Sequence, residues 1–293
     1  MTLPEFDYVA PKSLEEAGEI MLAQGRSCAV MAGGTDLILA LPKLVSKGLK
    51  TVIDLKTVPG LDRLDYVEGE GLYIGANTRL FDVHESKIVK EKMPAVAAAA
   101  HYVGSAQIRR KGTLVGSVCN GSPTGDCGSI LLAMKAVAHI WSPSGERDVP
   151  MDEFWLGLKQ IAADVTKGEI VTYVFVPELK AGECSAYLKH SVRKAMDLAI
   201  VGVAAWLKMD GNKVADCRIA VAGGGVTILR APLAEQLLIG KEITDSVIDE
   251  VSVQAMKEMN PRTSIRASAE YRADMIRVFT KRAIRKALES LEA

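Results

Sequence analysis

The sequence predicts an α+β protein that contains more than one domain. Its 293 residues are enough for one large domain or for two to three modest ones. Near the start, two short apolar segments flank a Gly-Gly turn and a helical stretch, which is the pattern of a strand–turn–helix–strand unit. After Pro177, long apolar strands come first and helices follow. That order indicates a separate α+β domain of about a hundred residues.

The first unit begins with a helix predicted at residues 13–25. Ser13 can cap this helix, Glu16 stands three residues further on, and Gly25 ends it. An apolar stripe of Leu14, Ala17, Ile20 and Met21 indicates the buried face. The elements predicted next are a strand at 28–32, a helical stretch at 36–46 and a strand at 51–55.

A second unit is predicted from Leu72 to Pro177. Four consecutive alanines at 97–100 fit a tightly packed buried helix. Ser142 to Gly145 predict a hairpin-type turn, and Pro177 ends the last strand of the unit. The predicted elements are strands at 72–76, 136–141 and 169–176 and helices at 81–90, 94–102 and around 130–134.

The third unit combines a hairpin with helices. Asp210-Gly211-Asn212 is a strong hairpin turn between two apolar strands. The strands are predicted at 199–208 and 214–222, and helices are predicted at 231–238, 244–259 and 268–291.

Composition excludes several classes of function. Lys+Arg and Asp+Glu both number 36, so the formal net charge is zero, which argues against nucleic acid as a partner. No run approaches the ~18 apolar residues of a membrane helix, so we expect no membrane span and a cytoplasmic location. The five cysteines contain no C-x-x-C pair. They indicate reduced thiols rather than a disulfide framework or a metal site, and we predict no metal ligands.

Two glycine-bearing segments carry the prediction of a ligand site. The first runs from Val30 to Leu37 and contains Gly33-Gly34, and the second runs from Gly112 to Asp126. Glycine lets the backbone turn sharply and expose its N–H groups. Consecutive exposed N–H groups bind anions without lysine or arginine, and two such places suit a dinucleotide with a central pyrophosphate. Neither segment matches the sequence of a Rossmann or Walker motif. The alternative interpretation is that both segments are plain turns.

Seven segments in order along nearly the whole chain resemble the FAD-binding subunit of the molybdenum hydroxylases, the medium subunit of the xanthine and carbon monoxide dehydrogenase family. They are Ala32–Leu37, Ile74–Thr78, Val103–Arg109, Gly112–Asp126, Arg193–Ala199, Gly223–Ala231 and Ala267–Arg272. The resemblance implies a two-part FAD-binding module of the vanillyl-alcohol oxidase type, followed by an α+β C-terminal domain. The implied boundaries are 1–58, 59–177 and 178–293.

The resemblance also implies cofactor-binding residues. In the first segment, main-chain amides would wrap the FAD pyrophosphate and Thr35 would add a hydroxyl; the residues are Val30, Met31, Ala32, Gly33, Gly34, Thr35, Asp36 and Leu37. In the second segment, the residues facing the flavin and the sugar chain would be Thr113, Gly116, Ser117, Asn120, Ser122 and Asp126. An ionised Asp126 would accept hydrogen bonds from ribityl or ribose hydroxyls. The family often has Gly-Gly-Asn where this chain has Val115-Gly116-Ser117.

Four residues outside the two segments complete the implied site. Val103 would pack against the adenine end, and Val171 would contact the cofactor from a strand. Lys189 would lie near the isoalloxazine, where a cation stabilises the anionic reduced flavin, and Leu198 would lie beside the ring. His190 follows Lys189 and is a further candidate for a side chain that approaches the flavin.

The resemblance implies an FAD-dependent oxidoreductase subunit that transfers electrons. Its partners would be a molybdopterin-binding large subunit and a small subunit with two [2Fe-2S] clusters, and its electrons would pass to NAD or another acceptor. Two alternatives stay open. One is a stand-alone flavin oxidase of the same fold, and the other is a non-catalytic nucleotide-binding assembly module. We find no Ser-His-Asp set and predict no catalytic side chain, so hydrolysis is disfavoured.

Overall fold

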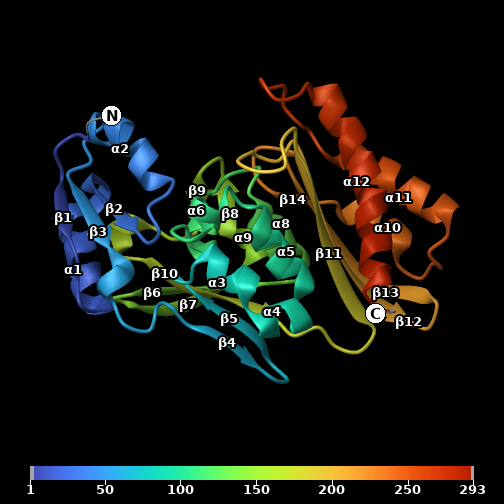
Figure 1. The fold of residues 1–293 in the computed structure, drawn as a ribbon, viewed down its shortest axis with the longest axis horizontal. Helices are drawn as coiled ribbons and strands as arrows, with labels where there is room; N and C mark the ends of the chain where they lie inside the picture. The colour runs from blue at the N-terminus through green and yellow to red at the C-terminus, as the bar shows by residue number, and fades with distance from the viewer. Residues whose placement is uncertain (1–2, 292–293) are drawn as a thin grey trace.

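The computed structural model describes residues 3–291. Three units follow one another along the long axis of the molecule, with the N-terminal unit at one end and the helices α10, α11 and α12 at the other (Figure 1). Each unit contains its own main sheet. The predicted boundaries near residues 58 and 177 fall between these sheets and stay predictions.

The N-terminal unit is a parallel sheet with strand order β1-β3-β2. The Ser13 hydroxyl accepts a hydrogen bond from the Glu16 amide at 3.1 Å, and the helix ends at Gly25 with φ of 55°, so both predicted ends are confirmed. The elements are β1 (Asp7–Val9), α1 (Leu14–Gln24), β2 (Cys28–Met31), α2 (Leu37–Val45) and β3 (Thr51–Asp54), with 3-10 helices at Gly25–Ser27 and Leu55–Thr57.

The middle unit is built on an antiparallel sheet of order β4-β5-β10-β6-β7. The predicted helix at 81–90 is two helices, because the chain leaves the helical conformation at Ser86, which caps the second. The strands are β4 (Leu64–Val67), β5 (Gly71–Gly75), β6 (Val137–Ser142), β7 (Gly145–Pro150), β8 (Trp155–Gly157), β9 (Gln160–Ile161) and β10 (Ile170–Pro177). The helices are α3 (Leu80–Glu85), α4 (Lys87–Lys92), α5 (Pro94–Tyr102), α6 (Ala106–Arg109), α7 (Leu114–Cys119), α8 (Asp126–Ala133) and α9 (Met151–Phe154), and a 3-10 helix lies at Val165–Lys167.

Helices α5 and α8 pack against each other in the core of the middle unit. The alanine-rich sequence of α5 buries Ala95, Ala97, Ala99 and Ala100, and every residue of α8 is buried. Small side chains let neighbouring elements approach closely, so the alanine run forms a buried helix as the sequence predicts.

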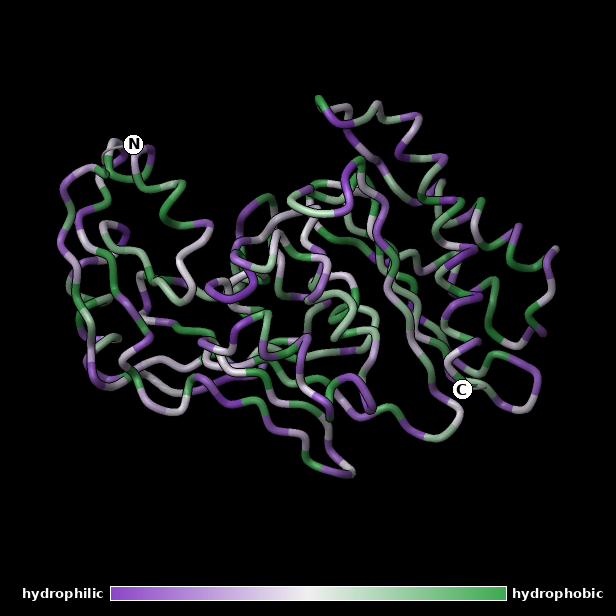
Figure 2. Tube along the Cα trace, in the orientation of Figure 1, coloured by the Kyte–Doolittle hydropathy of each residue, from purple (hydrophilic) through white to green (hydrophobic). Residues whose placement is uncertain are grey.

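The C-terminal unit is an antiparallel sheet of order β11-β12-β13-β14 covered by helices. Its strands are β11 (Glu183–His190), β12 (Val201–Asp210), β13 (Lys213–Ala222) and β14 (Leu229–Arg230), and its helices are α10 (Pro232–Leu238), α11 (Asp245–Glu258) and α12 (Ala269–Glu289). The turn at Gly211 has φ of 59°, which confirms the predicted hairpin. Helix α12 buries Ile276, Phe279, Ala283 and Ala287 at helical spacing, and its trace alternates between hydrophobic and hydrophilic (Figure 2).

The middle and C-terminal units share a continuous apolar interface. Helix α8 packs on β12 and β13, and Trp206 and Ala220 belong to the same buried core as the middle unit. Gly128 lies so close to the C-terminal unit that a Cβ placed on it would meet the Ile228 side chain, and the Trp155 indole of its own unit confines it as well. The two units are therefore docked by close packing.

All five cysteines are free, and burial raises the pKa of Cys119, Cys184 and Cys217 to about 12. Within residues 3–291, no helix has the length and apolar character needed to cross a bilayer, and no group of three or more His, Cys, Asp or Glu side chains is arranged to hold a metal ion.

A charged cluster at Asp152 joins the same two units. Its carboxylate accepts from Arg218 Nη1 at 2.7 Å and from Arg230 Nη1 at 2.9 Å. Burial alone would raise the pKa of Asp152, but hydrogen bonds from Arg230 and Arg218 outweigh it, so the pKa lies below its usual value. A group with a lowered folded-state pKa stabilises the fold above its unfolded pKa, and this stabilisation is lost as pH falls through the folded value.

We therefore expect Asp152→Asn to lower the free energy of unfolding by about 1 kcal/mol at pH 7, because the pair is partly exposed. Urea titrations at several pH values measure this difference. It should persist down to about pH 4 and shrink below that. Asp65→Asn, which removes an exposed pair with Arg63, is the control and should have little effect. An Asp152→Asn effect that is unchanged at pH 2 would contradict the assignment.

Candidate functional site

The first glycine segment forms an open loop between the end of β2 and the start of α2. Gly34 has φ of 73°, a conformation that glycine adopts without strain. In the described part of the chain, none of the backbone amides from Ala32 to Leu37 donates a hydrogen bond to a protein acceptor. The last of these belongs to the first turn of α2, where amides have no acceptor within the helix. These six consecutive amides, which have no protein acceptor, are called the open amides below.

The two predicted glycine segments lie side by side. A Cβ on Gly33 would overlap the Lys111 carbonyl oxygen and come within 2.7 Å of Gly112 Cα. A Cβ on Gly112 would in turn lie 3.1 Å from Thr35 Oγ1. The backbones of the two segments therefore meet at a distance that only glycine allows.

The second segment is not one open loop, because the helix α7 occupies its centre. The Thr113 hydroxyl caps α7 by accepting from the Gly116 amide at 3.0 Å, and the Ser117 amide donates to the Thr113 carbonyl at 3.0 Å. Asn120 ends this helix, and Ser122 Oγ lies 3.2 Å from Thr124 Oγ1. The run of open amides is consequently found in the first segment, while the second offers half-buried side chains.

Asp126 and Lys189 form a buried ion pair. Lys189 Nζ donates to Asp126 Oδ2 at 2.9 Å, and the Tyr187 hydroxyl donates to Oδ1 at 2.7 Å. The two charged side chains are only 4% and 7% exposed. Burial raises the pKa of Asp126, and the charge of Lys189 opposes this shift. Burial and the Asp126 carboxylate raise the pKa of Tyr187 well above its usual value, so Tyr187 stays protonated.

All three donors of Lys189 are occupied. Besides Asp126, its ammonium donates to the Tyr102 carbonyl at 3.0 Å and to the Asp197 carbonyl at 2.9 Å. An ammonium group has three N–H donors. Lys189 is therefore a neutralised and fully bonded cation that ties the middle unit to the loop before β12.

The other predicted residues lie in different surroundings. Val103 ends α5, and its carbonyl accepts from Arg109 Nη1 at 3.1 Å. Val171 is buried in β10, whereas Leu198 is 47% exposed in the loop before β12. His190 lies 2.9 Å from the Tyr271 hydroxyl and packs on Phe279 of α12. Neighbouring residues of a strand face opposite ways, so His190 points away from the Asp126–Lys189 pair.

Two lysines that the sequence did not single out accompany the glycine segments. Lys56 Nζ donates to the Ala32 carbonyl at 3.1 Å. Lys159, with φ of 55°, forms the turn between β8 and β9, and its amide donates to the Gly121 carbonyl at 3.2 Å. Burial raises the pKa of Asp36, and the charge of Lys159 counteracts this. No local motif marks either lysine, because each is brought there by the fold.

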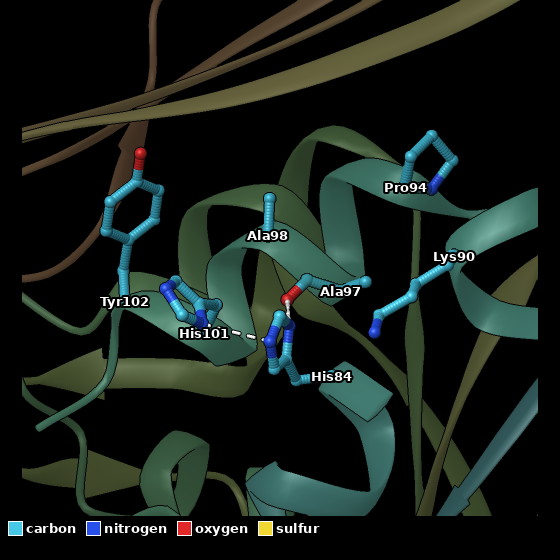
Figure 3. A pocket seen from close by; sticks show the side chains of 7 residues that line it. All are labelled: His84, Lys90, Pro94, Ala97, Ala98, His101 and Tyr102. Atoms are coloured by element: carbon cyan, nitrogen blue, oxygen red, sulfur yellow. Dashed lines mark hydrogen bonds between the residues drawn. The ribbon is translucent and has the colours of Figure 1, made fainter. Parts of the chain in front are cut away.

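A shallow groove on α3, α4 and α5 is separate from the predicted site. It has a volume of about 300 Å³ and is lined by His84, Lys90, Pro94, Ala97, Ala98, His101 and Tyr102. Figure 3 shows the His84 and His101 rings side by side, with 3.0 Å between His101 Nδ1 and His84 Nε2. None of the predicted cofactor-binding residues lines this groove.

Two family models match consecutive parts of the chain. Residues 4–179 match the family described as the FAD binding domain in molybdopterin dehydrogenase, and residues 186–287 match the CO dehydrogenase flavoprotein C-terminal domain. The chain belongs to the FAD-binding medium subunits of the carbon monoxide and xanthine dehydrogenase family. It is an oxidoreductase subunit, and its cofactor is FAD.

Individual relatives match this chain over nearly all of its length, at 96% of the chain or more. The glyceraldehyde dehydrogenase medium chain of Sulfolobus acidocaldarius is 34% identical, over 96% of this chain and 98% of its own length. The carbon monoxide dehydrogenase medium chain of Hydrogenophaga pseudoflava is 32% identical, over 97% of each chain. A solved structure of carbon monoxide dehydrogenase from Hydrogenophaga pseudoflava superposes with a TM-score of 0.93, at 31% identity and 99% coverage of both chains. The resemblance and the two-domain fold predicted from the sequence are thereby confirmed.

The first loop of the flavoprotein subunit fits a dinucleotide. A pyrophosphate carries only acceptors, and the six open amides from Ala32 to Leu37 supply only donors. The missing Cβ at Gly33 keeps this loop against the second segment. The residues present are therefore suited to the group that the family binds.

We expect Gly33→Ala to weaken FAD binding by at least about tenfold, or ~1.4 kcal/mol. The added methyl overlaps the Lys111 carbonyl oxygen, a backbone atom, so the two segments must separate. Quenching of FAD fluorescence by titrated apoprotein measures the affinity, and the melting temperature of the apoprotein reports the fold. Wild-type affinity in a folded Gly33→Ala protein would refute the role of the contact.

Proposed function

We propose that this chain is the electron-transferring FAD subunit of a molybdenum hydroxylase. In this proposal it receives electrons from the [2Fe-2S] clusters of a small partner subunit and delivers them to NAD or another acceptor. A large molybdopterin-binding partner would carry out the hydroxylation. The observation that carries the proposal is the run of open amides from Ala32 to Leu37, held against the second glycine segment.

The proposed binding mode assigns the pyrophosphate to the first loop. Amides of Gly33, Gly34 and Thr35 would donate to the phosphate oxygens, and the Thr35 hydroxyl would add a donor next to Gly112. From the second segment, the side chains of Ser117, Asn120 and Ser122 would hold the sugar chain and flavin side. FAD supplies the redox chemistry when bound, and the protein supplies orientation, burial and local charge.

The Asp126–Lys189 pair limits how strongly charge acts on the flavin. A free cation close to the ring would favour the anionic reduced cofactor, but the charge of Lys189 is balanced by Asp126 at 2.9 Å. Lys189 also holds the Asp197 carbonyl, next to Leu198. We therefore propose that Lys189 mainly positions the Leu198 loop beside the flavin, with a smaller electrostatic effect than an unpaired lysine.

Purification of the tagged chain from its own organism tests the proposed assembly. We expect FAD, iron and molybdenum to co-purify in a fixed ratio, because the partners would carry the metals. The chain produced alone should bind FAD and contain neither metal. A tagged Gly33→Ala chain is the matched variant, and it should keep the metals while losing FAD.

Other outcomes separate the remaining interpretations. If NAD is the acceptor, NADH should reduce the flavin of the purified complex. The absorbance band of oxidised flavin at about 450 nm should then bleach. Oxygen uptake by the chain without iron or molybdenum would instead support a stand-alone oxidase. A chain that assembles with partners but binds no FAD would contradict the proposal.

A further inference from the structure

Lys56 lies in direct contact with the first glycine loop. It sits in the 3-10 helix Leu55–Thr57 that follows β3, and its ammonium donates to the Ala32 carbonyl at 3.1 Å. Ala32 is the first residue of the run of open amides. The backbone of the first glycine loop is thus hydrogen-bonded to a side chain that follows β3 of the N-terminal sheet.

Lys56 is itself fixed by a buried carboxylate. Asp54 is 2% exposed, and it accepts from Lys56 Nζ at 2.7 Å, from the Lys56 amide at 2.9 Å and from the Tyr8 hydroxyl. Burial by itself would raise the pKa of Asp54, but the donors Lys56 and Tyr8 bring it below its usual value. Asp54 pairs in register with Met31 of β2, so the anchor lies directly beside the strand that enters the loop.

Holding the Ala32 carbonyl also orients the next amide. In a trans peptide, the carbonyl of one residue and the N–H of the next point in opposite directions, and the described residues contain no cis peptide bond. With the Ala32 carbonyl directed at Lys56, the Gly33 N–H is directed away from it. Gly33 also lies against the backbone of Lys111 and Gly112. The peptide between Ala32 and Gly33 is therefore held by two independent contacts.

We propose that Lys56 is a positioning residue for FAD binding, which aims the amides of the first loop at the cofactor pyrophosphate. The inference rests on the proposed binding mode. Its function comes from the hydrogen bond to Ala32 rather than from charge alone. The side chain is 53% exposed, so salt would screen a purely electrostatic contribution, whereas the hydrogen bond would persist.

Titration of deflavinated Lys56→Met protein with FAD tests the proposal. Losing a charged donor should weaken FAD binding by about tenfold or more, and the loss should persist in 0.5 M salt, well above physiological ionic strength of about 0.15 M. Lys56→Arg keeps a donor and should recover part of the affinity. Lys47→Met, at an exposed lysine just after α2, is the control and should bind FAD normally.

Fragments of the cofactor locate the effect. ADP contains the pyrophosphate and should lose affinity for Lys56→Met protein, whereas adenosine should not. Hydrogen exchange of the amides of residues 32–37 gives a second readout. FAD should slow this exchange strongly in wild-type protein and less in Lys56→Met protein. These comparisons within one variant hold even if the substitution lowers its melting temperature.

Two results would overturn the inference. One is Lys56→Met protein that binds FAD as tightly as the Lys47→Met control, and the other is a loss that disappears in 0.5 M salt. Gly33→Ala separates this inference from the binding mode on which it rests. If Gly33→Ala loses FAD and Lys56→Met does not, only the role of Lys56 is wrong; if neither loses FAD, the proposed binding mode is wrong as well.

Discussion

The close approach of two backbones at Gly33 is the constraint on which the proposed cofactor site depends. A side chain at this position would overlap the Lys111 carbonyl, so only glycine lets the loop after β2 lie against the second segment. The same loop leaves six amides without protein acceptors. Buried or half-buried amides cost free energy when they have no partner, and the fold accepts this cost where an anionic ligand can supply the acceptors.

The C-terminal unit is joined to the middle unit through charge as well as packing. Removing either member of the buried Asp126–Lys189 pair would leave an uncompensated charge in an apolar interface. Because Lys189 also holds carbonyls from Tyr102 and Asp197, one ammonium connects α5, α8 and the loop before β12. The position of Leu198 thus depends on the docking of two units.

Local signals predicted elements well where the residue itself determines the backbone. The cap at Ser13, the stop at Gly25 and the turn at Gly211 were all correct. Strand β11 was missed because Glu183–His190 show no clear alternation; one face packs on the middle unit and the other on α12. Helix α7 was missed because Gly112 and Gly116 suggested a loop, whereas Thr113 caps a short helix there.

By itself, the sequence determined many of the helices and strands, the two glycine segments and the family to which the chain belongs, since these depend on local patterns of residues along the chain. The tertiary structure decided which amides stay open, that Lys56 supports the first loop, and that Lys189 is paired with Asp126, 63 residues away. Hydrogen-bond partners of this kind are set by how distant elements pack, and no spacing along the chain encodes them.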